Sequence, residues 1–112
     1  MNEEVSSVYV TYPDEPTARS IARSLVERRL AACANIFDVC SIYRWNEEVQ
    51  EELEFASLLK IRSKDFQAVA EAIREMHPYD VPCIVRYDIA ESVEDYRGWI
   101  VESTARSLDH PQ

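Results

Sequence analysis

The chain has 112 residues, about the size of one typical domain, and 46% of them are hydrophobic, which is enough for one two-layer core. Its carboxylates outnumber its lysines and arginines 21 to 12, giving a net charge of −9, and this argues against a nucleic-acid partner because phosphates require clustered basic side chains. The acidic balance suits cations, or simply a well-solvated surface, and we expect a single domain over residues 1–112.

The first expected strand covers residues 5–12, which are rich in Val, Tyr and Thr and stop before Pro13. Asp14 is placed to cap a following helix, and Pro16 fits its first turn, where a missing N–H costs little. Hydrophobic residues then recur at helical spacing and form one stripe. They are Ala18, Ile21, Ala22, Leu25 and Val26.

Residues 33–45 change to the alternating pattern of a strand, but both of its faces are apolar. A sheet covered on one side should alternate more cleanly, so we expect the second face to contact another chain. Residues 46–51 are predicted to turn, and residues 52–62 to return as a third strand. One face of the third strand carries Leu53, Phe55, Leu59 and Ile61. One face of the second strand carries Phe37, Val39, Tyr43 and Trp45, and its other face carries Ile36, Cys40 and Ile42.

Ser63 is the predicted N-cap of a second helix, which Pro78 prevents from continuing. Residues 82–89 are a predicted fourth strand. Residues 92–95 resemble a capping box ahead of a third helix. The order β-α-β-β-α-β with an added C-terminal helix predicts an α+β, ferredoxin-like sandwich.

The first five residues contain no basic segment or apolar stretch long enough for a signal peptide, and no run approaches membrane-spanning length. We therefore expect a cytoplasmic protein without a membrane partner. Three widely spaced cysteines fit reduced thiols better than a disulfide framework. They are Cys33, Cys40 and Cys83.

Thiols and an imidazole suit copper or zinc, so Cys33 and His77 are candidate ligands for Cu(II) or another divalent cation. The chain has no Cys-x-x-Cys pair, and the ligands would have to converge from separate strands. The alternatives are that Cys33 and Cys40 are small core residues and that His77 caps a helix end.

Glu52, Glu54 and Lys60 share the parity of one strand face, with roughly 20 Å between Glu54 and Lys60 at ~3.3 Å per residue. Any site that used them would need groups from a neighbouring strand or subunit, and the alternative is solvent-facing charge. Tyr43 and Trp45 either line a pocket between subunits or serve packing.

His77, Tyr79, Asp80 and Lys60 offer an acid, a base and an electrophile for a small ligand, provided that they lie within hydrogen-bond reach of it. The sequence contains no Ser-His-Asp order, Walker loop or Rossmann fingerprint. Its one glycine, Gly98, falls in the last expected helix, so there is no glycine-rich phosphate cradle.

Four motifs follow one another along the chain: Arg29–Ile36, Ser41–Trp45, the Glu52, Glu54 and Lys60 spacing, and His77–Pro82. Together they resemble the CutA family, in that family's order, and the resemblance runs from about Val8 to Thr104. The resemblance implies a ferredoxin-like homotrimer joined through its long hairpin, a role in tolerance of copper and other divalent ions, and no enzymatic activity. This chain departs from the family in carrying Glu47 where Gly is usual, Asp80 for Glu, Cys83 for a carboxylate, and Val10 for a cysteine.

Three alternatives share this order of elements. A small-molecule signalling trimer like the nitrogen-regulatory proteins binds ligands between subunits, but the hairpin here lacks a flexible glycine-containing loop. An acylphosphatase-like hydrolase needs a phosphate-binding loop with an Arg, whereas residues 11–14 form an acidic loop that would repel phosphate. An RNA-recognition domain is disfavoured by the acidic charge.

Overall fold

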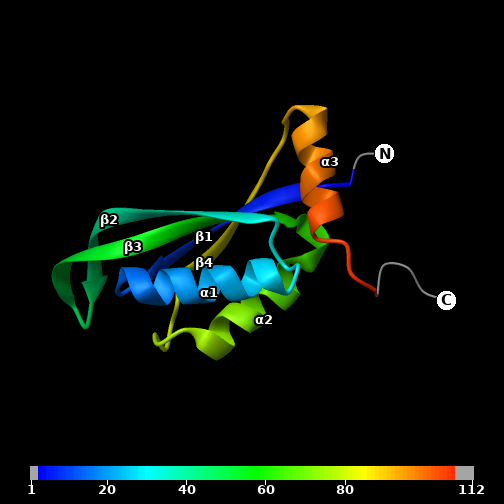
Figure 1. The fold of residues 1–112 in the computed structure, drawn as a ribbon. Helices are drawn as coiled ribbons and strands as arrows, with labels where there is room; N and C mark the ends of the chain where they lie inside the picture. Colours follow the sequence, from blue (N-terminus) through cyan, green and yellow to red (C-terminus); the bar gives the residue numbers. More distant parts are fainter. Residues whose placement is uncertain (1–2, 108–112) are drawn as a thin grey trace.

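Residues 3–107 are described by a computed structural model, in which four antiparallel strands form one sheet in the order β2-β3-β1-β4. Helices α1 and α2 lie side by side against one face of this sheet, and α3 stands at one end (Figure 1). This confirms the predicted ferredoxin-like α+β fold with an additional C-terminal helix. The elements are β1 (Val5–Tyr12), α1 (Glu15–Glu27), β2 (Cys33–Trp45), β3 (Glu48–Arg62), the short 3₁₀ helix η1 (Ser63–Asp65), α2 (Phe66–Met76), β4 (Ile84–Asp88) and α3 (Glu94–Ser103).

The start of α1 is as predicted. The backbone N–H of Thr17 donates to Asp14 Oδ1 at 2.9 Å, and a proline occupies the first turn. The hydrogen bond favours the ionised carboxylate, so it lowers the pKa of Asp14. The inner face of α1 then packs on β1, β3 and α2, and this core includes Ile21, Leu25, Val8, Val10, Tyr12, Leu59, Ile61, Val69 and Ile73.

The starts of α2 and α3 differ from the prediction. Ser63 does not cap α2, because its Oγ lies 2.5 Å from Ser6 Oγ across the sheet and the chain makes η1 before α2 begins at Phe66. The capping box is also wrong, because Val93 is the N-cap of α3 and makes no side-chain cap bond. The fourth strand covers 84–88 rather than 82–89.

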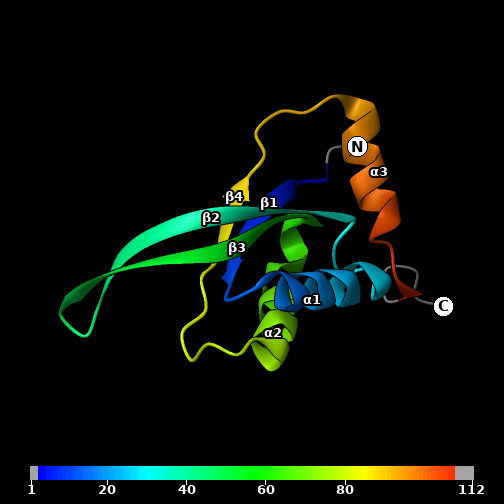
Figure 2. The same ribbon diagram turned by 60° about the vertical axis from the view of Figure 1, so that its left-hand side comes forward.

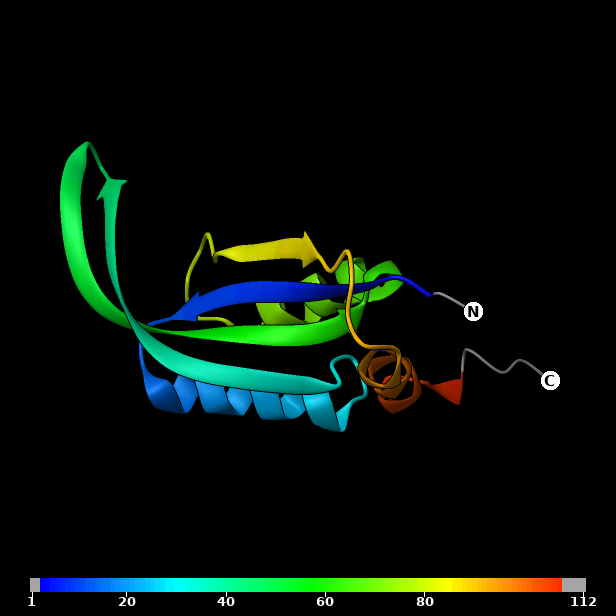
Figure 3. The ribbon, with the colours of Figure 1, turned by 90° about the horizontal axis from the view of Figure 1, so that it is seen from above.

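The hairpin of β2 and β3 turns through only two residues, with Trp45 paired to Glu48. Asn46 and Glu47 have φ values of 53° and 66°, as the tight turn of a two-residue hairpin requires. The predicted turn over 46–51 is therefore too long. The far part of the hairpin, residues 40–53, is called the arm. The arm curls away from β1 and β4 and from α1 (Figures 2 and 3).

The sheet face turned away from α1 and α2 is called the open face. Val8, Val10 and Tyr12 point into the core, so alternation and strand register place the intervening residues of all four strands on the open face. Large hydrophobic side chains remain exposed there, and others are exposed on the arm. They are Phe37, Val85 and Tyr87 on the open face and Ile42, Val49 and Leu53 on the arm.

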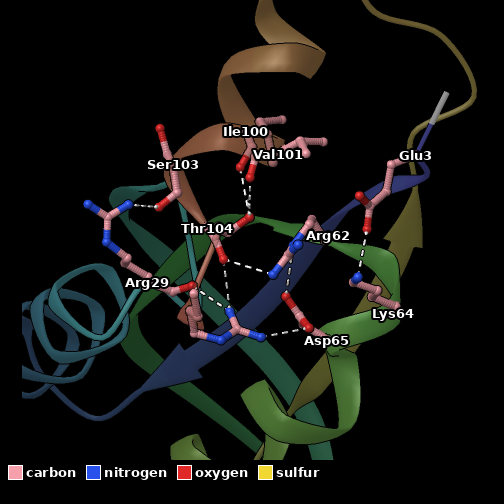
Figure 4. A network of polar contacts seen from close by, with 10 residues as sticks. Glu3, Arg29, Arg62, Lys64, Asp65, Ile100, Val101, Ser103 and Thr104 are labelled. Atoms are coloured by element: carbon pink, nitrogen blue, oxygen red, sulfur yellow. Dashed lines mark hydrogen bonds and ion pairs between the residues drawn. The ribbon is translucent and has the colours of Figure 1, made fainter. Parts of the chain in front are cut away.

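A buried polar network ties the C-terminal segment to the body (Figure 4). Arg62 donates to the carbonyl oxygen of Thr104 at 2.8 Å and to Asp65 Oδ2 at 3.2 Å. Arg106 donates to the other Asp65 oxygen at 2.9 Å and to the carbonyl oxygen of Arg29 at 2.7 Å. One carboxylate therefore fixes two guanidinium groups and holds the segment after α3 against the start of α2.

Candidate functional site

A groove of about 1120 Å³ lies between the arm and the segment that joins α2 to β4, with part of the open face lining it. It brings together five of the eight predicted site residues: Tyr43, Trp45, Glu54, Tyr79 and Asp80. The residues that line it are Tyr9, Thr11, Pro13, Ser41, Ile42, Tyr43, Trp45, Gln50, Glu52, Leu53, Glu54, Pro78, Tyr79, Asp80, Val81 and Cys83.

Glu54 is the most buried carboxylate of the groove, with 7% of its surface exposed. The hydroxyl group of Tyr79 donates to Glu54 Oε2 at 2.6 Å. Burial, and then this hydrogen bond, raise the pKa of Tyr79. Tyr79 is therefore a neutral donor that compensates Glu54 for lost water, and the solvent-facing alternative is wrong for Glu54.

Glu52 and Tyr43 form a second pair of the same kind on the arm. The hydroxyl group of Tyr43 donates to Glu52 Oε1 at 2.5 Å, and this bond raises the pKa of Tyr43 to about 12. The sequence prediction left Glu52 out of the site. With residues 46–51 in the turn, Glu52 would follow the turn directly, whereas the two-residue turn places it opposite Ser41 and diagonal to Tyr43.

His77 follows the last turn of α2 and supports the groove from behind rather than lining it. Its Nδ1 accepts from the backbone N–H of Tyr79 at 3.2 Å, so the ring proton lies on Nε2, which donates to the carbonyl oxygen of Thr11 at 2.8 Å. The ring also stacks on Tyr12, with centroids 5.3 Å apart. His77 therefore orients the segment that carries Tyr79.

Cys33 and Lys60 lie away from the groove, opposite each other on β2 and β3. Lys60 Nζ donates to Asn35 Oδ1 at 3.3 Å, and Cys33 Sγ lies 3.4 Å from the hydroxyl oxygen of Tyr96. This contact raises the pKa of Tyr96 to about 12. The sequence spacing had already placed Lys60 too far along the strand to meet Glu54.

The other two cysteines differ in their surroundings. Cys40 is exposed on the arm, so the prediction of a core position is wrong for it. Cys83 lines the groove, and burial, followed by the nearby charge of Glu54, raises the pKa of its thiol. Across residues 3–107, no three His, Cys, Asp or Glu side chains gather closely enough to form a metal site.

The charges of the groove have one sign. Glu52, Glu54 and Asp80 line it, and none of its lining residues in the described part of the chain is Lys, Arg or His. Such a surface repels phosphate and attracts cations. It therefore does not suit the acyl-phosphate substrate of the hydrolase alternative.

Comparisons with known proteins agree with this description. The profile of the family described as "CutA1 divalent ion tolerance protein" matches residues 6–103. The divalent-cation tolerance protein CutA of Thermus thermophilus is 47% identical over 103 residues, which span 91% of this chain and 98% of that protein. The CutA of Pyrococcus horikoshii is 38% identical over 88% of this chain and 97% of its own length.

Solved structures lead to the same family. The structure of the periplasmic divalent cation tolerance protein CutA from Archaeoglobus fulgidus matches with a TM-score of 0.89 at 35% identity, covering 90% of this chain and 99% of that one. That of Thermus thermophilus CutA1 matches with a TM-score of 0.87 at 44% identity, covering 90% and 99%. The chain belongs to the CutA1 divalent ion tolerance protein family. None of the helices within residues 3–107 has the length and hydrophobicity needed to span a membrane.

Proposed function

We propose that this protein serves in tolerance of divalent cations and that the groove is where it meets them. The observation that carries the proposal is the set of three lining carboxylates without a basic side chain among the described lining residues. Carboxylate oxygens suit hard cations such as Mg²⁺ and Ca²⁺, and the thiol of Cys83 adds a ligand for softer ions such as copper or zinc. The names of the relatives support this role.

Cys33 and His77 are proposed ligands for Cu(II) outside the groove. Both ring nitrogens of His77 are hydrogen bonded in the protomer, so copper would bind there only after the Tyr79 N–H releases Nδ1. Cys33 is paired with Lys60 on the strands and needs its partner ligands from elsewhere, such as a second copy.

We further propose that three copies assemble through the open face and the arm. In the protomer, Leu53 has 83% of its surface exposed, and a lone protein of marginal stability does not readily tolerate a large apolar surface in water. Ile42, Val49 and Leu53 lie on one side of the arm, and the exposed rings of Tyr43 and Trp45 lie on the other. This supports the predicted contact with other copies. The groove then opens at the boundary between copies, because Ile42 and Leu53 line it and also lie on this contact surface.

We also propose that the protein is not an enzyme and works in the cytoplasm. The negative charge of the groove supports the first point, since it repels the phosphate substrates of the hydrolase alternative. Free thiols at Cys33, Cys40 and Cys83 support the second. Rapid turnover of acyl phosphates or phosphate esters would contradict the first.

The cation site is tested by titrating the pre-reduced, full-length protein with Zn(II) and with Cu(II) in a calorimeter under anaerobic conditions. We expect saturable binding that weakens at least about 10-fold in Glu54→Gln, since one direct charge is removed. Glu71→Gln, on an exposed position of α2 away from the groove, is the matched control. Absence of binding to both metals, or equal affinity in Glu54→Gln, would overturn the proposal.

A further inference from the structure

The groove is much larger than an ion and its first ligands. Its volume of about 1120 Å³ slightly exceeds that of typical pockets for small organic molecules, roughly 300–1,000 Å³. A bare Ca²⁺ or Mg²⁺ draws its oxygen ligands to within about 2.0–2.6 Å, so a metal ion and its ligands would fill only a small part of this volume. The groove therefore has room for an organic molecule as well as for a metal ion.

Aromatic side chains make up much of its wall. Tyr9, Tyr43, Trp45 and Tyr79 all line it, and the rings of Tyr43 and Trp45 remain exposed in the protomer. The face of an aromatic ring attracts an ammonium or guanidinium group and also covers the apolar part of a ligand. These rings belong to three separate segments, the arm, β1 and the connection after α2, so they offer surfaces on more than one side.

The carboxylates remain able to accept hydrogen bonds. Tyr79 engages Oε2 of Glu54 and Tyr43 engages Oε1 of Glu52, which leaves one further oxygen on each carboxylate for a ligand donor. Glu52 and Glu54 are two residues apart on β3 and therefore share one face of the strand, which places the two Tyr–Glu pairs close to each other. An N–H donor that carries positive charge makes the strongest hydrogen bond with such an oxygen.

We propose that the groove binds a small organic cation, with its ammonium or guanidinium group hydrogen bonded to Glu54 and Glu52 and its apolar part against Trp45 and Tyr43. This inference rests on the negative charge of the groove that the proposed function also uses, and it adds an organic class of cation to the divalent ions proposed there. The two Tyr–Glu pairs hold the carboxylates in place before the ligand arrives, which reduces the entropy lost on binding. In the proposed trimer the neighbouring copy would contribute to the rim.

The test uses three molecules of similar size and different charge: 2-phenylethylammonium, the neutral 2-phenylethanol and the anionic 3-phenylpropionate. Each is titrated calorimetrically into the full-length protein at neutral pH. We expect the ammonium compound to bind at least about 10-fold more tightly than the alcohol, which corresponds to one charge-assisted hydrogen bond. We expect no detectable binding of the carboxylate. Equal binding of all three, or binding of none, would overturn the inference.

Variants assign the binding to the groove. Glu54→Gln should weaken the binding of 2-phenylethylammonium about 10-fold, while Glu71→Gln should leave its affinity unchanged. Trp45→Ala should weaken the binding of both the ammonium compound and the alcohol. If Glu54→Gln fails to fold, Glu52→Gln serves in its place, because Glu52 is exposed and its removal leaves the core intact. Unchanged affinity in the folded Glu variants would contradict the inference.

Competition separates this inference from the proposed function. Binding of Zn(II) or Cu(II) that depends on Glu54, together with no ammonium binding, would overturn the organic ligand and leave the metal site standing. Ammonium binding without any metal binding would overturn the metal site and leave the organic ligand standing. If the protein binds both the metal and the ammonium compound, saturating 2-phenylethylammonium should weaken metal binding at the shared carboxylates.

Discussion

Glu54 is a carboxylate largely withdrawn from water, and the side chains around it explain how that burial is tolerated. Tyr79 donates to it, and His77 fixes the backbone of Tyr79 through Nδ1. His77 is itself held by the carbonyl oxygen of Thr11 at the end of β1. The position of this carboxylate thus depends on a chain of hydrogen bonds that runs from β1 through the segment after α2 to β3.

Tyr79→Phe should lower the free energy of unfolding by about 1–3 kcal/mol, because it removes a donor from a buried acceptor. Urea denaturation followed by circular dichroism measures the change. Glu71→Gln is the control, since Glu71 is exposed on α2, on the side of the sheet away from the proposed contact surface. Equal stability of the two variants would show that the Tyr79–Glu54 bond contributes nothing.

The Tyr43–Glu52 bond predicts a pH dependence at the alkaline end. The bond needs the phenol proton and raises the pKa of Tyr43 from 10.0 to about 12 in the folded protein. Its stabilisation is therefore complete below pH 10.0 and is lost as the pH rises towards about 12. The difference in urea midpoint between the wild type and Tyr43→Phe should be constant up to pH 10 and then shrink; a difference that grows with pH would contradict this sign.

Local signals predicted some elements well and failed at others for identifiable reasons. The start of α1 could be predicted because Asp14 caps Thr17, only three residues away. The start of α2 could not be predicted in this way, because the hydroxyl group of Ser63 is hydrogen bonded to that of Ser6, 57 residues earlier. The predicted turn is too broad because Glu48–Glu51 are mostly polar, yet they pair as strand residues on the arm.

The site was predictable to a similar extent. Tyr43, Trp45, Glu54, Tyr79 and Asp80 came from motifs that resemble a known family, and the groove does unite them. Glu52 was missed as a site residue because its place depends on the register of the hairpin, which the overlong turn obscured. The orientation of His77 depends on tertiary contacts with β1 that no spacing reveals.

The hairpin turn leads to a prediction that is independent of any ligand. Glu47 holds a φ of 66°, a left-handed conformation that costs a residue with a side chain about 1–2 kcal/mol. Glu47→Gly should therefore raise the free energy of unfolding by about 1 kcal/mol, measured in urea. Glu48→Gly, one residue later and within β3, should lower it by about 0.5–1 kcal/mol. A destabilised Glu47→Gly variant would contradict the assigned turn.

The protomer is elongated, with extents of 52 × 28 × 22 Å, because the arm reaches beyond the helices that cover the rest of the sheet. Apolar residues are exposed on both sides of the arm, so an extended arm is unfavourable in water for a single copy of the chain. Assembly with other copies would bury these residues and hold the arm in the shape that lines the groove. The predicted homotrimer and the cation site are therefore linked through the same residues.

Sedimentation equilibrium of the full-length protein, alone and with the substitution Leu53→Lys, tests this account most directly. We predict a mass of three chains of 13.0 kDa for the wild type and a shift towards single chains for Leu53→Lys, since a charge would be buried between copies. Val93→Lys, at an exposed position next to α3 and away from the arm, should remain trimeric. A wild-type protein that sediments as a single chain would contradict the account.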